Sequence, residues 1–275
     1  MAANIQSYTA ISLQELKLDD REEDMTVTTA DKIRFERITR EYIMSEHARE
    51  NIGTYKEKRL HAILKLFMDE DASHHEIKCG PFVADILSDN QIIEIQTGSF
   101  YPMQKKIKYY LEETDCNILV VRPLPHIKHI VWISPESGEI TSRKRSPKKA
   151  EPKDTLRDWY YLREFIGNPR FQLKFLLLEE EEYRLLCGWS YDRKRGSQRY
   201  ERIPVSLLGE EVFVSKEDYR AFLPDKLPPN FKASEYMKIT KLGSFAAYSA
   251  LKLLCELGLV EKGEKVGRGY IYRKI

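Results

Sequence analysis

Long apolar runs, paired cysteines and a leader pattern are all missing from this 275-residue chain. No stretch of about 18 apolar residues occurs, so a conventional membrane-spanning helix is not expected. The N-terminal segment has no basic stretch followed by an apolar one, as a secretory leader would. The four cysteines are scattered without a CxxC pair, which argues against zinc fingers. We therefore expect a cytoplasmic protein with reduced thiols and no membrane partner.

Charge of one sign is also not in excess, because 45 basic side chains face 43 acidic ones. Hydrophobic residues make up 42% of the chain, as in a globular protein, and the length suffices for two domains. Shifts in composition predict four segments along the chain. These are a helical N-terminal cap at 1–50, an α/β core at 51–141, a basic linker with a middle α/β extension of unassigned fold at 142–225, and a helical and hairpin tail at 226–275.

Hydrophobic periodicity predicts the elements of the core. Helical spacing gives a first helix ending near Asp69, and a period of two then gives three short strands within 74–97. A second helix begins near Pro102, and two further strands are expected at 117–124 and 129–141. The middle extension is expected to hold a helix at 155–167, a strand at 171–179 and then an acidic run. Together these elements predict an α/β fold with a mixed sheet flanked by helices.

Charged and amide side chains interrupt the apolar hairpin "ADILSDNQIIEIQTG". Side chains alternate along a strand, so Glu94 and Gln96 share one face, and hairpin pairing would bring Asp85 to the same edge. On the preceding helix Glu57 extends the apolar stripe and is expected to point toward the sheet. Each acid also has a plainer explanation. Asp85 could be a solvated turn residue, Glu94 could pair with Lys78 or Arg122, and Glu57 could be one charge of the exposed run "KEKR".

A divalent cation would offset the cost of burying these acids together. Mg²⁺, or Mn²⁺ in its place, favours a few carboxylates plus a carbonyl and waters. The expected ligands are Asp85, Glu94, Glu57 and the backbone carbonyl of Ile95.

The segments "EKRLHAILKLF", "PFVADILS" and "IIEIQTGS", with the helix after them, resemble the PD-(D/E)XK nuclease superfamily. The resemblance covers roughly residues 50–135 and implies a restriction-endonuclease-like fold. It implies that Asp85 and Glu94 are metal ligands, that Glu57 is the acid of the first helix, and that the protein is a hydrolase acting on phosphodiester bonds.

Gln96 stands where the superfamily usually has lysine. Glutamine can only form hydrogen bonds, whereas lysine would supply positive charge to the reaction. The CoiA-like nucleases resemble this sequence in having Glu-x-Gln, so the change does not by itself imply inactivity. A compensating cation is expected from Lys105 or Lys106 on the following helix.

The tail reads as a short helix, a longer helix and a hairpin with a Gly-rich basic tip, a winged helix-turn-helix pattern. Its charge leans basic, which favours duplex DNA as the partner with little sequence preference. The expected DNA-binding residues are Lys241, Ser244, Lys252, Lys265 and Arg268.

Two functions of different classes follow from these patterns. The first is a metal-dependent DNA nuclease whose winged helix holds the duplex. The second is a non-catalytic DNA-binding regulator on a degenerate nuclease scaffold, and a protein-binding adaptor is a weaker third. Whether two copies pair as a homodimer to cut both strands stays open at this point.

Overall fold

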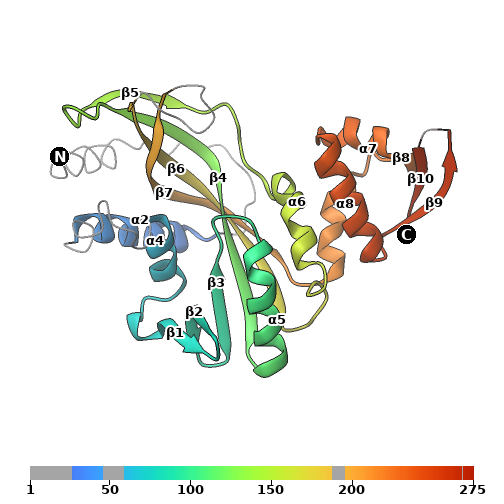
Figure 1. Cartoon of the computed structure of the whole chain (residues 1–275), viewed down its shortest axis with the longest axis horizontal. Coiled ribbons are helices and arrows are strands. Elements are labelled where there is room, and N and C mark those ends of the chain that lie inside the picture. The colour runs from blue at the N-terminus through green and yellow to red at the C-terminus, as the bar shows by residue number, and fades with distance from the viewer. Residues whose placement is uncertain (1–26, 46–58, 188–195, 268) are drawn as a thin grey trace. The chain divides into compact units, whose positions relative to one another are not determined.

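The computed structural model describes residues 27–45, 59–187, 196–267 and 269–275 (Figure 1). The strands of its larger sheet are β1 (His75–Cys79), β2 (Phe82–Ser88), β3 (Gln91–Ile95), β4 (Asn117–Ile133), β5 (Ile140–Arg145), β6 (Phe171–Leu185) and β7 (Gln198–Phe213). They form a seven-stranded sheet in the order β1-β2-β3-β4-β6-β7, with β5 paired to β4. β2 and β3 are antiparallel, whereas β3 and β4 are parallel. This mixed sheet, flanked by helices, confirms the expected α/β class.

The chain divides into two compact units, each assembled from three separate segments. Unit 1 comprises Met1–His75, Pro123–Ala150 and Leu176–Glu211, and unit 2 comprises Glu76–Arg122, Glu151–Phe175 and Val212–Ile275. β4 and β6 therefore contribute residues to both units. The four expected segments were predicted from shifts in composition, whereas the two units are defined by contacts between residues. The boundaries of the four segments stay a prediction. Much of the expected cap at 1–50 lies outside the described residues.

Two helices of unit 1, α2 (Thr29–Met44) and α4 (Arg59–Met68), pack against each other. Thr28 caps α2 by accepting a hydrogen bond from the backbone N–H of Asp31 at 3.1 Å. The apolar stripe of each helix is buried, and the rings of Phe35 and Phe67 meet edge to face with their centroids 5.0 Å apart. Both helices therefore form where the periodicity predicts them.

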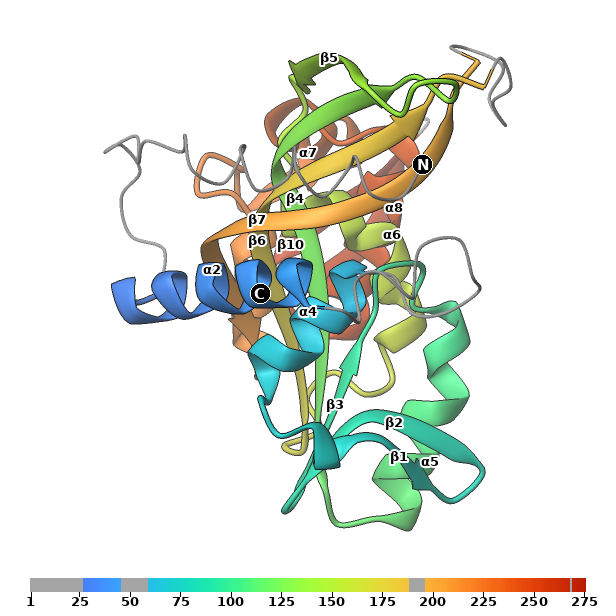
Figure 2. The same cartoon turned by 90° about the vertical axis from the view of Figure 1, so that its left-hand side faces the viewer.

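The strands of unit 1 have a core in which Val131 and Ile133 of β4, Tyr183 of β6 and Ile203 of β7 cluster with Ile43 of α2. These side chains are all less than 5% exposed. The core sits where helix α2 meets the sheet, which Figure 2 shows from the helix side.

The acidic run Glu179–Glu182 lies inside β6, so the expectation that the strand ends at its start is wrong. Cations from other strands of the sheet reach two of the buried carboxylates. Arg143 of β5 contacts Glu181 at 2.9 Å, and Lys128 of β4 contacts Glu182 at 3.5 Å. Buried charges need partners of opposite charge. These partners lie on other strands, so the sequence of the acidic run does not reveal them.

The candidate site in unit 2 is positioned by the β2–β3 hairpin and by α5 (Gln104–Glu113). A 3-10 turn, η2 (Tyr101–Met103), carries Pro102 and leads into α5, as the sequence predicts. Ile107 and Tyr110 are fully buried on the inner face of α5. In Figure 1 this helix runs beside β3 and β4.

A single long helix expected at 155–167 is wrong. The chain forms 3-10 turn η3 (Pro152–Thr155), short helix α6 (Leu156–Trp159) and 3-10 turn η4 (Tyr160–Leu162). Leu156, Trp159, Leu162 and Phe165 are buried at a spacing of three residues, which suits 3-10 geometry better than a 3.6-residue turn.

Trp159 is the centre of an aromatic core in unit 2. Its ring stacks on Phe175, with the centroids 5.1 Å apart, and meets Tyr219 and Phe222 edge to face. Its indole N–H donates to the Thr155 hydroxyl at 2.6 Å. Tyr219 and Phe222 belong to the 3-10 segment η5 (Lys216–Phe222), so this core joins two distant segments of the chain.

The C-terminal segment of unit 2 contains β8 (Asn230–Lys232), α7 (Ala233–Thr240), α8 (Ser244–Glu256), β9 (Val260–Val266) and β10 (Gly269–Lys274). The strands form a separate antiparallel sheet in the order β8-β10-β9. Gly258, which has a φ of 75°, follows the end of α8. The two helices and the terminal hairpin thus form at the positions expected from the sequence.

Strand β4 runs without interruption through a segment where two strands were expected. Pro123 and Pro125 suggest a break, because proline cannot donate to a strand ladder. However, β3 pairs with residues 117–121 and β5 pairs with residues 129–133, so both prolines fall between these two partners. Within the described ranges, no helix is both long and apolar enough to cross a bilayer.

Candidate metal and nucleic-acid site

The β2–β3 hairpin brings Asp85 and Glu94 together. Ile86 pairs with Ile93, and Leu87 with Ile92, around a tight turn in which Asp89 has a φ of 45°. The next pair in this register is Asp85 and Glu94, whose side chains therefore project from the same face.

At this end of the hairpin the Asp85 carboxylate, instead of a backbone carbonyl, accepts a hydrogen bond from the β3 backbone. Its Oδ2 accepts a hydrogen bond from the backbone N–H of Ile95 at 2.7 Å. Such a bond fixes the carboxylate against the β3 backbone rather than leaving it in solvent. It also turns Asp85 toward the Glu94–Ile95 peptide, the segment from which the sequence predicts further metal ligands.

Glu94 is 3% exposed and is held by two residues of α5. Lys106 Nζ lies 2.6 Å from its Oε2, and the Tyr110 hydroxyl donates to its Oε1 at 3.3 Å. Lys106 and Tyr110 are four residues apart, so they lie on the same face of the helix. Helix α5 therefore presents one cation and one hydroxyl to the buried carboxylate.

The Asp85 and Glu94 carboxylates are close enough to influence each other's charge. The pKa of Glu94 is raised to about 7, first by burial and then by the nearby Asp85 carboxylate, while Lys106 opposes the shift. Burial followed by the Glu94 charge also raises the pKa of Tyr110, so its hydroxyl stays a donor. Two carboxylates and a backbone carbonyl are the kinds of ligand that Mg²⁺ and Mn²⁺ take.

The third acid that the sequence predicts for this site falls outside the described part of the chain. Glu57 was expected to converge with Asp85 and Glu94, and it lies among residues 46–58, whose placement is not described. Among the residues that the structure does describe, no group of three or more His, Cys, Asp or Glu side chains is arranged to hold a metal ion.

Gln96 is held by its own loop. Its backbone N–H donates to the Val121 carbonyl at 2.9 Å, and its side-chain amide donates to the Ser99 carbonyl. Arg122 donates to the Gln96 carbonyl at 3.1 Å and lies over the Phe100 ring. Because the oxygen and the nitrogen of the Gln96 side-chain amide lie in one plane, the hydrogen bond to Ser99 also fixes the direction of the amide oxygen.

The two lysines expected to compensate for Gln96 differ in position. Lys106 contacts Glu94, whereas Lys105 is exposed on a neighbouring face of α5. Tyr110 is not among the site residues expected from the sequence, yet its hydroxyl contacts Glu94. Its spacing of four residues from Lys106 is the signal that could have identified it.

The expected DNA-binding residues lie on the C-terminal segment. Lys241 ends α7 in the left-handed region with a φ of 57°, and it is exposed, as are Ser244 and Lys265. Lys252 Nζ donates to the Tyr160 hydroxyl at 2.6 Å, so the outer face of α8 is turned toward η4 at this point. Arg268 lies outside the described residues.

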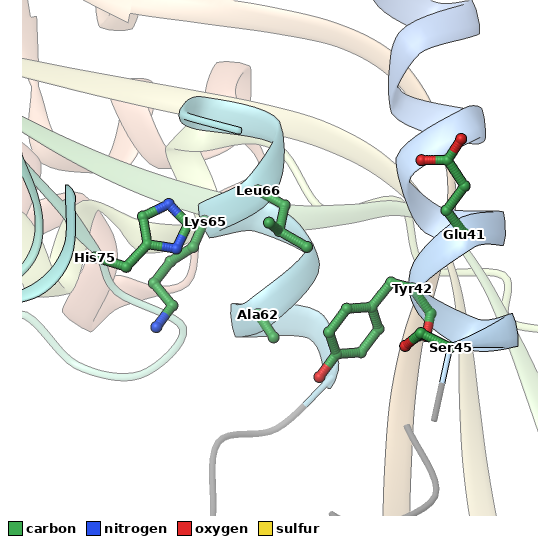
Figure 3. Close-up of a pocket in the computed structure, with 7 residues that line it drawn as sticks. All are labelled: Glu41, Tyr42, Ser45, Ala62, Lys65, Leu66 and His75. Carbon is green, nitrogen blue, oxygen red and sulfur yellow. The ribbon is translucent and has the colours of Figure 1, made fainter. Parts of the chain in front are cut away.

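A separate pocket of about 380 Å³ lies in unit 1 between α2 and α4 (Figure 3). Tyr42 and Ser45 line it from α2, Ala62 and Lys65 from α4, and His75 from the start of β1. It contains none of the residues expected to carry chemistry, so the candidate site rests on the hairpin and α5 instead.

A comparison with protein families finds one match, to the family described as "Domain of unknown function (DUF8091)", over residues 58–214. The match includes Asp85, Glu94 and Lys106 and ends before the C-terminal segment. No curated protein and no solved structure matches the chain. Because the family match spans more than half of the 275 residues, the chain belongs to the family described as Domain of unknown function (DUF8091).

Proposed function

We propose that this chain is a metal-dependent nuclease that hydrolyses phosphodiester bonds in DNA. The observation that carries the proposal is the pairing of Asp85 with the buried Glu94 at one end of the hairpin, where the Asp85 charge contributes to the raised pKa of Glu94. A divalent cation bound by both carboxylates would stabilise two acids placed this close together. The order of helix, three strands, helix and strand supports a restriction-endonuclease-like core.

Asp85, Glu94 and the Ile95 carbonyl would hold Mg²⁺ or Mn²⁺, with Glu57 as a further acid. When bound, the ion supplies polarisation of a phosphoryl oxygen and a lower pKa for a coordinated water. Lys106, whose ammonium lies 2.6 Å from the Glu94 carboxylate, would offset the negative charge that develops on the phosphate. Gln96 offers a hydrogen bond to the attacking water from a side chain that Ser99 fixes.

The C-terminal segment would hold duplex DNA. Its order of strand, two helices and hairpin supports a winged helix-turn-helix. Lys241 and Ser244, at the turn before α8, and Lys265, on the hairpin, are exposed and suited to phosphate contacts. Lys252 donates a hydrogen bond to Tyr160, so we expect phosphate contacts from Lys241, Ser244 and Lys265 rather than from Lys252. This favours duplex binding with little sequence preference.

Cleavage of a labelled duplex with added Mg²⁺ or Mn²⁺ tests the proposal. Asp85→Asn and Glu94→Gln should each abolish the metal-dependent cleavage. Asp89→Asn provides a matched control, because it makes the same chemical change on the same hairpin at an exposed turn whose φ of 45° asparagine tolerates. Cleavage that persists equally in all three variants would exclude this site as the active centre.

A non-catalytic DNA-binding regulator is the second candidate function. The observation that favours it is the Gln96 amide, which supplies no charge and is bonded to its own loop. In that case salt-sensitive duplex binding would appear without cleavage in either metal. Neither duplex binding nor cleavage is expected of a protein-binding adaptor.

A further inference from the structure

A row of exposed and half-buried aromatic side chains in unit 2 lies next to the candidate site and plays no part in the proposed metal chemistry. Its members, which we call the aromatic ridge, are Tyr101, Tyr160, Tyr161, Phe245 and Tyr248. Tyr101 follows the loop that carries Gln96, the two central tyrosines belong to η4, and the last two lie on α8. In Figure 1, α6 and α8 run side by side.

The ridge starts at the candidate site. The Ser99 carbonyl accepts from the Gln96 amide, and the Ser99 hydroxyl accepts from the Tyr101 backbone N–H. The same hydroxyl donates to Asp158 at 3.1 Å, which ties this loop to α6. The Tyr101 and Tyr161 rings then meet at 5.2 Å between centroids, and Tyr161 meets Tyr160 at 6.4 Å.

The ridge continues onto α8 through cations that lie on aromatic rings. Lys252 Nζ lies 4.2 Å from the centre of the Tyr160 ring, and the Arg163 guanidinium lies 3.8 Å from the centre of the same ring. Arg157 of α6 lies 4.6 Å from the centre of the Phe245 ring. Two acids are close by: Asp158 accepts from Ser99, and Glu256 pairs with Arg163 at 3.4 Å.

Packing alone does not account for these rings. Tyr101 is 64% exposed, Phe245 63% and Tyr248 53%, whereas Trp159 and Tyr236 in the cores of the same unit are fully buried. Exposed aromatic groups of this extent, placed together, are typical of a binding surface. Rings and cations alternate along the ridge. A matching partner would therefore present flat unstacked groups to the rings and negative charge to the cations.

We propose that the aromatic ridge binds a single-stranded segment of DNA and guides it to the candidate site. Bases of a single strand stack on aromatic side chains, and its phosphates meet the accompanying cations. In a continuous duplex the base faces are stacked on one another and are not available to the ridge. The inference rests on the proposed nuclease function and narrows its substrate to duplexes that carry a single-stranded end or branch.

Binding of a labelled oligothymidine of about 15 nucleotides in EDTA separates this inference from cleavage. The wild type should bind it more tightly than a blunt duplex of equal length at the same salt concentration. Tyr101→Ala and Phe245→Ala should each weaken binding about fivefold or more. Tyr101→Phe keeps the stacking face and should bind like the wild type.

Ile33→Ala is the matched control, because Ile33 is also 63% exposed but lies on α2. All four variants alter exposed side chains, so their thermal midpoints should match that of the wild type. Single-strand binding that is absent, or equally strong in the alanine variants, would overturn the inference. It would also be overturned if the alanine variants lost self-association or capture of a protein instead of oligonucleotide affinity.

The two proposals fail in distinguishable ways. If the ridge inference is wrong, the enzyme still cleaves blunt duplex DNA in a manner that depends on Asp85. If the nuclease proposal is wrong, the oligothymidine still binds through Tyr101 and Phe245 while no cleavage occurs in Mg²⁺ or Mn²⁺.

Discussion

Glu94 is the residue in which the chemistry of the site is concentrated. Its carboxylate is nearly inaccessible, yet it meets one ammonium and one hydroxyl while facing a second acid. The protonation of Glu94 therefore depends on the neighbouring charges and on any cation bound at the site. It also makes Glu94 a natural probe of bound cations, since a metal ion and a proton compete for the same oxygens.

The stability of the metal-free protein should fall as the pH rises through the pKa of Glu94. The folded pKa is about 7 and the ordinary value is 4.5, so the folded state binds more protons between these limits. The free energy of unfolding should therefore decrease from about pH 5 to pH 8, by about 2–3 kcal/mol from this group. Chemical denaturation in EDTA at several pH values, with wild type and Glu94→Gln, measures the difference. Identical pH slopes for the two proteins would contradict the assignment.

Lys106 should contribute to cleavage far more than other lysines of its helix. Lys106→Ala removes the cation closest to Glu94, and we expect the cleavage rate at saturating Mg²⁺ to fall about a hundredfold or more. Lys108→Ala is the control, since Lys108 is 58% exposed and pairs only with Glu112 among its described ion pairs. Equal rates in both variants would remove Lys106 from the mechanism.

At the scale of elements, the β1–β2 turn holds the hairpin against α5. Gly80 has a φ of 60°, and a Cβ placed there would lie 2.0 Å from the Tyr109 hydroxyl oxygen. Phe82 also meets the Tyr109 ring edge to face, with centroids 5.5 Å apart. The turn, the strand and the helix are thus fitted to one another around a single glycine.

Gly80→Ala should lower the free energy of unfolding by about 1–3 kcal/mol, because the new methyl group is strained and displaces Tyr109. Gly98→Ala is the control, since Gly98 does not have a positive φ and nothing lies within 4 Å of the added Cβ. Equilibrium unfolding in urea compares the two. A Gly80→Ala protein as stable as the control would mean that the turn does not brace the hairpin.

Sequence patterns predict elements well where one period applies. The stripes of α2, α4 and α5 and the alternation of the β2–β3 hairpin are all found, and so are Asp85 and Glu94 as neighbours. The patterns fail where tertiary contacts decide. The prolines of β4 are tolerated because of where its partners end, and Glu180–Glu182 stay in β6 because cations from other strands reach them.

At the scale of the whole molecule, candidate chemistry and candidate DNA contacts belong to unit 2. Its three separate chain segments supply the hairpin with α5, the aromatic ridge, and the C-terminal helices with their sheet. The family match extends over residues 58–214, so it includes the hairpin but not the C-terminal segment. Chemistry and duplex binding should therefore be separable by mutation.

Duplex affinity should fall steeply with salt concentration if the C-terminal segment neutralises phosphates. Lys265→Ala should weaken binding to all sequences about equally and reduce the slope of log affinity against log salt by about one. Arg40→Ala removes the same charge from exposed α2 and serves as the control. Fluorescence anisotropy with unrelated duplexes measures both quantities. An unchanged slope for Lys265→Ala would remove the terminal hairpin from the interface.

Anomalous diffraction from a crystal soaked in manganese would show whether Asp85 and Glu94 bind a divalent cation. We expect an anomalous peak between the two carboxylates and within coordination distance of the Ile95 carbonyl. The same soak of Asp85→Asn should show no peak. The claim is contradicted if the wild type has no peak there and the Lys106 ammonium alone occupies the space beside Glu94.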